Sequence, residues 1–464
     1  MAKRWRLLPH DASRVEHLMR QSRLSAVVAQ VLLRRGVYQP EDVQRFLENR
    51  LNLLRDPEDL PGASVAADQI HQAITDKRSI VIYGDYDADG ITGTAILFNG
   101  LRMLGADVSY FVPNRLEDGY GLSNDAIRKL VDRGKQLIIS VDCGIASPTE
   151  AELCRELNVD LVVTDHHQFG DRLPNATLVH PRLPGTNYPF SGLCGAGVAF
   201  KLAWSICQRA CGAKRVTEQL RSYLMQSLSL AAIGTVADVV PLLDENRILV
   251  HHGLRSLQAN PSVGLRELLS ITKLDTKSSL SSEDIAFALA PRLNATGRLG
   301  QAQLGVELLT TDNPSRAKAL AEYIDGLNGS RQTLERSVYL AADKQVKEEF
   351  DPQANAALVL GGVNWHKGVI GVVAGRIADK YARPTIILSL DSVAGRAAVG
   401  SARSAGMIDL HAVLDQCSEH LISFGGHAAP PVSILTKVAW TLSEKPLRCR
   451  LTTCSRQLPV GDPH

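Results

Sequence analysis

The chain has 464 residues, of which 45% are hydrophobic and 22% are charged, the composition of an ordinary globular protein with two to four domains. The formal net charge of +2 is too small to indicate nucleic-acid binding, because a basic surface depends on where its charges lie. The basic N-terminus precedes no apolar run, and the most apolar window, 227–243, is too short for a membrane span. A signal peptide and a membrane span are therefore not expected, and the protein is predicted to be cytoplasmic.

The cysteine pattern argues against a disulfide scaffold or a zinc module. Eight cysteines are present, but no two form a Cys-x-x-Cys pair and no cysteine–histidine set has zinc spacing. They are predicted to be free thiols in a reducing compartment.

The first 60 residues have a mostly helical pattern, with Pro40 at a helix start. From residue 79, short apolar runs alternate with segments of helical periodicity. This alternation predicts βαβ units and a parallel sheet, although it does not reveal the strand order. The predicted strands span 79–84, 107–112, 137–142 and 160–164, and the predicted helices span 91–104, 123–133 and 148–157.

The second half of the chain begins with a mainly helical region, 193–310, followed by a long polar helical connector that is interrupted at Gly326 and Gly329. The βα pattern then returns, with strands at 357–362 and 384–390 around a helix at 369–381. The predicted fold class is α/β, with a parallel-sheet domain joined by a long helix to a smaller α/β domain. The predicted divisions are a helical N-terminal segment (1–60), a catalytic domain (61–312), a connecting helix (313–350), a substrate-binding domain (351–429) and an atypical tail (430–464).

Acidic residues gather where the predicted strands end. Three carboxylates alternate directly after the strand 79–84, one closes the strand 137–142, and an Asp-His-His triplet follows the strand 160–164. In open α/β sheets this edge faces the crevice where ligands bind. The residues in question are Asp85, Asp87, Asp89, Asp142, Asp165, His166 and His167, and a later isolated acid, Asp238, joins them in GTVADVVPL.

Crowded carboxylates raise one another's pKa unless a cation neutralises them. Oxygen ligands with one or two imidazoles suit Mn²⁺ or Mg²⁺, and imidazole favours Mn²⁺. Two such ions are a known device for phosphoryl transfer. A single aspartate at a strand end is more often a helix cap, and the pair His251–His252, which has no acidic neighbours, is interpreted as structural or exposed. The combination of four acidic segments instead predicts a two-metal hydrolytic site.

The motifs DYDADG, VDCG and TDHH, followed by an isolated aspartate, resemble in their order those of the DHH phosphoesterases. A longer set of motifs resembles the RecJ family of single-strand-specific exonucleases within that superfamily, and it covers about residues 70–428. The motifs are YGDYDADG (83–90), VPNRLEDGYGL (112–122), LCGAGVAFKL (193–202), APRLNATGRLG (290–300), SARS (401–404) and GGHA (425–428). Tyr83 stands where several DHH phosphatases have a histidine.

The resemblance implies roles for individual residues. Two divalent ions, preferably Mn²⁺ but also Mg²⁺, would be held by Asp87, Asp89, Asp142, His166 and Asp238, with Asp85 assisting. His167 is expected to act on the scissile phosphate and is grouped with Asp165 as catalytic. The expected substrate contacts are Arg115, Tyr120, Arg292, Asn294, Arg298, Ser401, Arg403, Ser404, Gly425, Gly426 and His427, which offer guanidinium, hydroxyl and close backbone contacts to phosphate.

After residue 429 the chain departs from the family pattern. The final segment contains Pro430–Pro431 and only two acidic residues, and no sustained period emerges from it. We interpret it as a truncated or frame-shifted ending that lacks the oligonucleotide-binding module of RecJ-like proteins.

The resemblance implies 5′-to-3′ hydrolysis of single-stranded DNA in recombination and repair, by a monomer that works with a single-strand-binding protein and a helicase. Two alternatives stay open at this point. One is a DHH phosphodiesterase for short oligonucleotides or cyclic dinucleotides, and the other is an impaired nucleic-acid-binding product. Membrane association is not expected.

Overall fold

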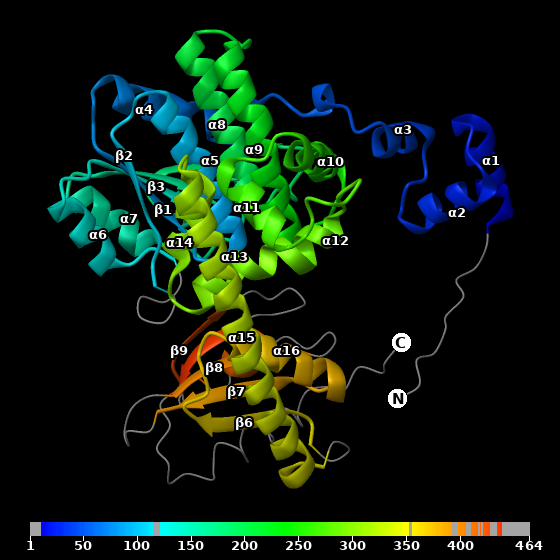
Figure 1. Ribbon diagram of the computed structural model, residues 1–464, viewed down its shortest axis with the longest axis vertical. Helices are drawn as coiled ribbons and strands as arrows, with labels where there is room; N and C mark the ends of the chain where they lie inside the picture. Colours follow the sequence, from blue (N-terminus) through cyan, green and yellow to red (C-terminus); the bar gives the residue numbers. More distant parts are fainter. Residues whose placement is uncertain are drawn as a thin grey trace.

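The structure is a computed structural model that describes residues 11–114, 121–351, 355–391, 398–404, 410–415, 418, 421–426 and 434–438. Figure 1 shows two globular parts connected by one long helix, with a small helical unit beside the larger part. The α/β fold class predicted from the sequence is confirmed. None of the helices in these described ranges is long and apolar enough to cross a membrane.

The small N-terminal unit contains α1 (Ala12–Ser22), α2 (Ala26–Arg34) and α3 (Pro40–Glu48). These helices share a small core, to which Leu18, Ala29 and Leu32 contribute. Two contacts connect α3 and its C-terminal end to the larger part: Arg247 Nε donates to the Phe46 carbonyl at 2.6 Å, and His252 donates to the Asn49 carbonyl at 2.6 Å. His252 therefore has a structural contact, in agreement with its interpretation from the sequence.

The larger part is built on a five-stranded, wholly parallel sheet with the strand order β2-β1-β3-β4-β5. The four predicted strands are present, and a short fifth strand that the sequence pattern did not indicate closes one edge. The strands are β1 (Ile80–Gly84), β2 (Val108–Phe111), β3 (Leu137–Val141), β4 (Asp160–Thr164) and β5 (Thr177–Val179).

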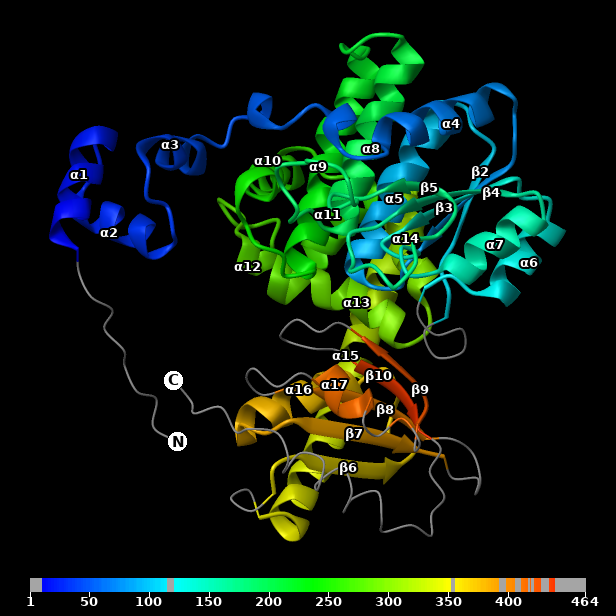
Figure 2. The same cartoon turned by 180° about the vertical axis from the view of Figure 1, so that it is seen from behind.

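Alternating residues of this sheet face two different cores. Ile80 and Ile82 pack with α4 (Ala63–Thr75), α5 (Ala88–Met103) and α8 (Gly195–Cys211), whereas Val81 and Tyr83 pack with α6 (Asn124–Asp132) and α7 (Pro148–Glu156). Figure 2 shows the helices on both sides of the sheet. The sheet is therefore buried on both faces, as its continuous apolar strands require.

Helix α5 begins at Ala88, three residues before its predicted start at Ile91. Its N-cap is Asp87, whose Oδ1 accepts hydrogen bonds from the backbone N–H groups of Asp89 (2.9 Å) and Gly90 (3.1 Å). The helix therefore starts within the acidic motif, and the second half of the motif forms its first turn. A capping aspartate satisfies N–H groups that would otherwise be unpaired at this terminus.

The rest of the larger part is helical, as predicted. Helix α9 lies beside both α5 and α8, and its C-terminus reaches the carboxyl edge of the sheet. The elements are η1 (Leu51–Leu53), η2 (Pro57–Asp59), α9 (Glu218–Ala237), α10 (Asp244–Ala259), α11 (Val263–Ile271), α12 (Ser282–Asp284), the π-helix η3 (Ile285–Leu289), α13 (Ala290–Arg298) and α14 (Ala302–Thr310).

The connector is α15 (Pro314–Glu349), a single helix of 36 residues that runs through both parts of the molecule (Figure 1). The predicted interruptions at Gly326 and Gly329 are wrong, because both glycines lie inside the unbroken helix. Each glycine weakens a helix by only about 1 kcal/mol, and packing at both ends outweighs this cost. Leu320 and Ile324 belong to the core of the larger part, whereas Val338 belongs to the core of the smaller one.

The smaller part has a mixed sheet with the strand order β6-β7-β8-β10-β9, in which β6 and β7 are parallel and the other neighbours are antiparallel. Strand β10 (Ile434–Val438) belongs to the segment in which no regular element was expected. The proposed boundary at residue 429 therefore divides this sheet, although most of the tail lies outside the described residues. The other elements are β6 (Leu358–Val363), α16 (Ile370–Tyr381), β7 (Thr385–Leu390), β8 (Ala398–Arg403), α17 (Leu410–Asp415) and β9 (Leu421–Gly426).

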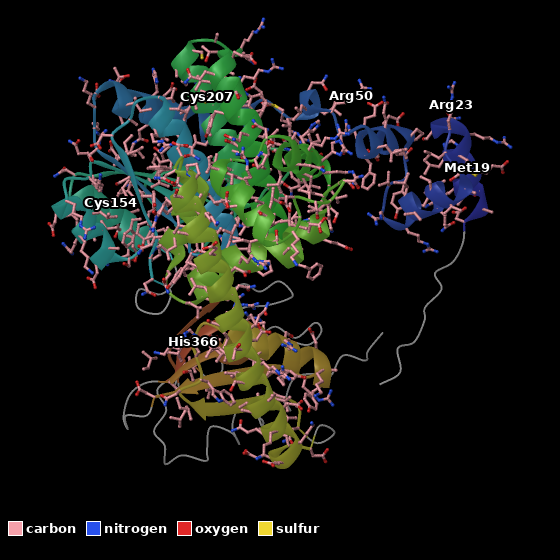
Figure 3. All side chains as sticks on the ribbon, in the orientation of Figure 1. Met19, Arg23, Arg50, Cys154, Cys207 and His366 are labelled. Atoms are coloured by element: carbon pink, nitrogen blue, oxygen red, sulfur yellow. The ribbon has the colours of Figure 1, made fainter. Side chains whose placement is uncertain are left out.

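The cysteines of the described residues are free, as predicted: Cys143, Cys154, Cys194, Cys207 and Cys211 form no disulfide. Figure 3 labels Cys154 in α7 and Cys207 in α8, on opposite sides of the sheet. Both are buried in apolar cores, and burial raises the pKa of each thiol to about 12. These thiols are therefore core residues with little thiolate character.

A buried ion pair fastens the segment before α4 to the helices behind the sheet. Lys201 and Glu245 are fully buried, and Lys201 Nζ lies 2.5 Å from Glu245 Oε1. Lys201 also donates to the Arg55 carbonyl at 2.6 Å, while the Arg55 backbone N–H donates to Glu245 at 3.0 Å. The Tyr188 hydroxyl donates to the second Glu245 oxygen. Glu245 thus accepts hydrogen bonds from three residues of this cluster and has partners on both carboxylate oxygens.

Replacing Glu245 by alanine should lower the free energy of unfolding of the larger part by about 3–5 kcal/mol, because the ammonium group of Lys201 would remain buried without its counter-ion. Differential scanning calorimetry would measure this loss. Lys344→Ala is the control, since it removes an exposed ion pair with Glu348 at 3.8 Å that should be worth less than about 1 kcal/mol. Equal transition temperatures for the two variants would contradict the assigned role.

Candidate metal centre

The first acidic motif places three carboxylates around the N-terminus of α5. Asp87 caps the helix, and Asp89 in its first turn is almost completely buried. The backbone N–H groups of Gly195 and Ala196, at the start of α8, donate to the two oxygens of Asp89 at 2.6 and 2.8 Å. Two helix termini thus meet at these carboxylates, and the positive ends of both helix dipoles stabilise their negative charge.

Two glycines allow this close approach. A Cβ atom at Gly195 would lie 2.5 Å from Asp142 Oδ1, and one at Gly234 would lie 2.4 Å from Asp89 Oδ1. Both distances are shorter than a non-bonded contact allows, so any larger residue would displace a carboxylate. Sequence reasoning assigned no role to Gly195 or Gly234. The available signal was the small-residue start of α8 in LCGAGVAFKL.

The second and third motifs bring Asp142 and His166 to the same place. Asp142 follows β3 with a φ of 63°, a left-handed conformation that turns the chain directly after the strand. His166 follows β4. Its Nε2 atom lies 3.1 Å from Asp142 Oδ1, 3.6 Å from Asp238 Oδ2 and 3.9 Å from Asp89 Oδ2. Three carboxylates that are distant from one another in the sequence therefore converge on one imidazole nitrogen.

The converging side chains form three overlapping groups in which each member offers an atom within 4.8 Å of the others: Asp85 with Asp87 and Asp142; Asp89 with His166 and Asp238; and Asp142 with His166 and His167. His166 Nε2 is buried and has no hydrogen-bond partner among the described residues. This donor set fits divalent cations, because oxygen ligands with an imidazole suit Mn²⁺ in particular. The chain thus carries acidic and histidine groups that are able to hold a metal.

The electrostatics of the site favour a cation. Burial, together with the neighbouring Asp87, raises the pKa of Asp89 to about 6. Burial and the charges of Asp89 and Asp87 raise the pKa of Asp238 to about 8, and the same causes raise that of Asp142 well above its ordinary value. Burial lowers the pKa of His166 to about 3, so this imidazole is neutral. Uncharged imidazole is the form that binds metals.

Asp165 behaves differently from the other aspartates. It accepts hydrogen bonds from the backbone N–H groups of Ile145 (2.9 Å), His166 (2.7 Å) and His167 (3.1 Å), and His167 Nδ1 lies 2.7 Å from its Oδ1. Burial alone would raise the pKa of Asp165, but the hydrogen bond and the charge of His167 lower it below its ordinary value. Burial would likewise lower the pKa of His167, yet Asp165 raises it to about 9. Asp165 therefore orients His167 and belongs to none of the three groups that could hold a metal.

His180 and Arg182, which the sequence analysis did not identify, hold the backbone of the histidine pair through hydrogen bonds. His180 Nε2 donates to the His167 carbonyl at 2.9 Å, and its Nδ1 accepts from the Arg182 backbone N–H at 3.0 Å. The Arg182 guanidinium also donates to the His166 carbonyl. His180 and Arg182 follow β5, the strand that the sequence pattern did not indicate, so their proximity to the histidines could not be expected.

The expected substrate residues of α13 have distinct contacts. Asn294 Oδ1 accepts from the Ala88 backbone N–H at 2.8 Å, which places it beside the acidic motif. Arg292 is turned towards the connector, where Nη2 lies 2.7 Å from Asp325. Arg298 Nη1 donates to the Gly368 carbonyl of the smaller part at 3.2 Å. Asn294 therefore lies next to the metal centre, whereas Arg292 holds α13 to α15 and Arg298 joins the two parts.

The smaller part turns its β6–α16 loop towards the larger part. A Cβ atom at Gly368 would lie 2.0 Å from the Arg298 carbonyl oxygen, so the two parts touch here through their backbones. His366, in the same loop, is labelled in Figure 3. Ser401 and Arg403 of β8 lie next to α16, because a Cβ atom at Gly371 would be 3.0 Å from Ser401 Oγ and from Arg403 Nη2. Ser404 follows β8, and Gly425 and Gly426 end β9. Arg115, Tyr120 and His427 lie outside the described residues.

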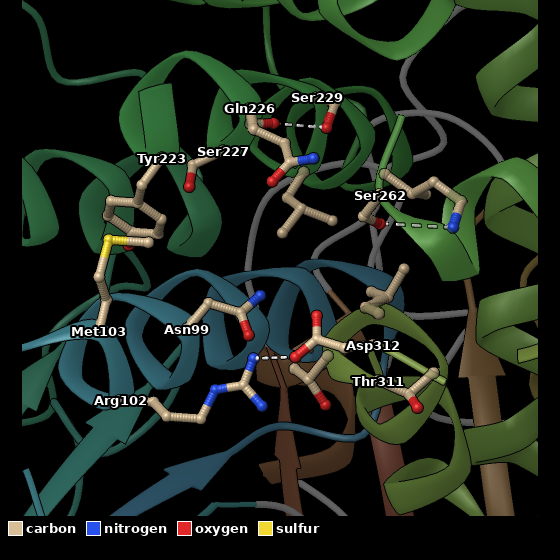
Figure 4. A pocket seen from close by; sticks show the side chains of 14 residues that line it. Asn99, Arg102, Met103, Tyr223, Gln226, Ser227, Ser229, Ser262, Thr311 and Asp312 are labelled. Carbon is tan, nitrogen blue, oxygen red and sulfur yellow. Dashed lines mark hydrogen bonds and ion pairs between the residues drawn. The ribbon is translucent and has the colours of Figure 1, made fainter. Parts of the chain in front are cut away.

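A pocket of about 340 Å³ lies at the other end of α5, between α5, α9, α11 and α14 (Figure 4). Its lining includes Asn99, Arg102, Gln226 and Asp312, and Arg102 donates to Asp312 at 2.9 Å. No carboxylate of the metal centre takes part in it. The candidate active site is therefore the carboxyl edge of the sheet and not this pocket.

Comparison with known protein families agrees with this geometry. The DHH family, N-terminal domain, matches residues 79–235, and the DHHA1 domain matches residues 354–429. The parallel sheet with its Asp-His edge and the smaller mixed-sheet domain thus define a protein of the DHH class.

Individual relatives narrow the assignment. The single-stranded-DNA-specific exonuclease RecJ of Dickeya dadantii is 38% identical over 418 residues, which are 87% of this chain and 71% of that protein. RecJ of Bacillus subtilis is 40% identical over 425 residues, 91% of this chain and 52% of that protein. The crystal structure of RecJ in complex with Mn²⁺ from Thermus thermophilus has a TM-score of 0.80 at 31% identity and covers 98% of this chain and 62% of that chain. The chain belongs to the RecJ family. It spans about half the length of the Bacillus relative.

Replacing Gly195 by alanine should weaken Mn²⁺ binding by about 10- to 100-fold, because the added Cβ must displace the carboxylate of Asp142 and disturb the amides that hold Asp89. Isothermal titration with Mn²⁺ would measure this change. Gly197→Ala is the matched control in the same helix, since its Cβ would meet a leucine methyl group at 3.3 Å. Equal Mn²⁺ affinities in the two variants would rule out the close approach as a requirement of the site.

Proposed function

We propose that this chain is a metal-dependent exonuclease that hydrolyses single-stranded DNA from 5′ to 3′ in recombination and repair. The observation that supports it most directly is the convergence of Asp89, Asp142 and Asp238 on His166 at the carboxyl edge of a parallel sheet. Membership of the RecJ family supplies the substrate class, and the polarity comes from that family alone.

The donor groups divide between two divalent ions, Mn²⁺ or Mg²⁺. We assign Asp85, Asp87 and Asp142 to one ion, and Asp89, His166 and Asp238 to the other, with Asp142 close to both groups. When bound, two such ions activate a water molecule and stabilise the attacking and leaving oxygens of a phosphodiester. Structures of RecJ from Thermus thermophilus contain Mn²⁺ and Mg²⁺.

His167 is assigned to the phosphate. Its Nδ1 is engaged with Asp165, and we assign donation of a proton to a phosphate oxygen to Nε2. The raised pKa of about 9 keeps this imidazole protonated at neutral pH. A protonated imidazole beside a phosphodiester stabilises the charge that develops in the transition state.

We assign the bound single-stranded DNA to the region between the two parts of the molecule, where Arg298 of α13 meets the β6–α16 loop. Ser401, Arg403 and Ser404 of the smaller part would bind backbone or terminal phosphate. The family further suggests a single-strand-binding protein and a helicase as partners, a monomeric state and a cytoplasmic location, and we adopt these as parts of the proposal.

The decisive experiment is digestion of end-labelled single strands of graded length with added Mn²⁺, beside duplex DNA and a cyclic dinucleotide. Single strands should be degraded from the 5′ end, and EDTA should abolish the activity. Each of Asp87→Ala, Asp89→Ala and Asp238→Ala should lower the rate by more than about 10²-fold, because each removes a ligand and its charge. Asp132→Ala, at the exposed end of α6, is the control. Preferred cleavage of the cyclic dinucleotide, or normal rates in all three variants, would refute the proposal.

Substitutions of the two neighbouring histidines should have different effects on turnover and on metal binding. His167→Ala should lower turnover by about 10²–10⁴-fold while Mn²⁺ affinity stays unchanged, because this residue donates to the phosphate. His166→Ala should instead weaken Mn²⁺ binding. Parallel titration calorimetry and single-turnover assays would separate the two effects, with His251→Ala as a control from the second histidine pair. Identical metal-binding defects in His166→Ala and His167→Ala would refute this division of roles.

A further inference from the structure

Val239 is unusual in both its conformation and its exposure. It directly follows Asp238, and its φ of 60° lies in the left-handed region. For a β-branched residue this is a genuine outlier, because the branched side chain clashes with the backbone there. Its side chain is 85% exposed, the highest value among the exposed large hydrophobic residues in the described part of the chain. A strained and exposed apolar residue at the rim of a site calls for a functional explanation.

The conformation itself has a simple origin, because Val239 occupies the position after the C-cap of α9. A left-handed residue commonly ends a helix here, and glycine or asparagine is the usual choice. Other helices of this chain follow that preference, with Gly105 after α5, Gly134 after α6 and Asn158 after α7. Among the non-glycine residues with positive φ in the described ranges, Val239 is the β-branched one. Helix termination therefore explains the left-handed φ at position 239, but it does not explain why the residue there is a valine.

The exposure is not explained by packing either. Val240 and Leu242 in the same loop pack against the main core, so the loop satisfies its apolar contacts without Val239. Consecutive Cα atoms are about 3.8 Å apart, which places Val239 beside the carboxylate that lies 3.6 Å from His166. Val239 is therefore close enough to these groups to contact the base of a nucleotide whose phosphate they hold.

We propose that Val239 is a specificity-determining residue whose isopropyl group packs against the base of the nucleotide at the cleaved phosphate. This inference rests on the proposed function. The faces of all four bases are apolar π surfaces, so such a contact tolerates any sequence but requires a base whose face is not covered by a stacked neighbour. It would thus help to select nucleotides that have left the base stack at the point of cleavage.

The test uses substitutions that relieve the backbone strain at Val239 and also remove its contact with the base. Val239→Gly and Val239→Asn should both be at least as stable as the parent, with a rise in the transition temperature of about 2 °C, because both residues suit the left-handed region. Both should bind a 5′-phosphorylated strand with phosphorothioate linkages about 5- to 10-fold more weakly in fluorescence anisotropy with Mn²⁺. Val239→Ile should bind normally, and the Mn²⁺ affinity of all three variants should equal that of the parent.

A matched control and a modified substrate make the test specific. Lys273 has the same left-handed conformation at the position after the C-cap of α11, far along the chain from the metal centre. Lys273→Gly should relieve the backbone strain there and leave the binding of single-stranded DNA unchanged. A strand that is abasic at the nucleotide of cleavage should bind the parent and Val239→Gly equally well. If Val239→Gly binds and digests normal strands as well as the parent does, this inference is overturned while the proposed function stands. If the parent itself digests no strand, the proposed function fails first.

Discussion

The arrangement depends on one electrostatic constraint: several carboxylates must lie side by side in a buried place. Asp89 and Asp142 are almost fully buried, and their pKa values are raised because burial and mutual repulsion penalise the charged form. Backbone amides at the start of α8 offset part of this cost by donating to Asp89. The rest of the charge is available to cations. The glycines of α8 and α9 follow from the same constraint, since only a residue without a Cβ leaves room for the carboxylates.

One aspartate at the same edge of the sheet, Asp165, has a lowered pKa instead of a raised one. Asp165 is just as buried, but three backbone amides and an imidazole surround it, so it stays ionised. Its charge is used to hold His167 in a protonated and oriented state. His166, the adjacent residue, is neutral and turned towards the other carboxylates. A difference of one position in the chain thus separates a neutral imidazole that faces several carboxylates from one that is held by Asp165 at its Nδ1.

The remainder of the molecule keeps this edge in a fixed relation to the smaller domain. Helix α15 contributes to the cores of both domains, so it connects them as a rigid rod and not as a loose linker. A second contact, the backbone approach of Gly368 to Arg298, joins the two domains directly. Behind the sheet, the buried pair of Lys201 and Glu245 anchors the segment that leads in from the N-terminal helices. Two attachments and one anchor therefore fix how the acidic edge of the sheet lies relative to the smaller domain.

The sequence by itself determined the α/β class, the positions of four parallel strands and the acidic residues at their ends, because period and residue type are local properties. It also indicated the family through contiguous motifs. It could not show that Asp87 caps a helix, that Asp165 serves His167, or that Arg292 pairs with Asp325, because these roles depend on which segments become neighbours. The glycine requirement at Gly195 and Gly234, the support from His180 after an unpredicted strand, and the strand β10 were likewise decided by tertiary structure. Non-local contacts carry no sequence period, so only the folded chain reveals them.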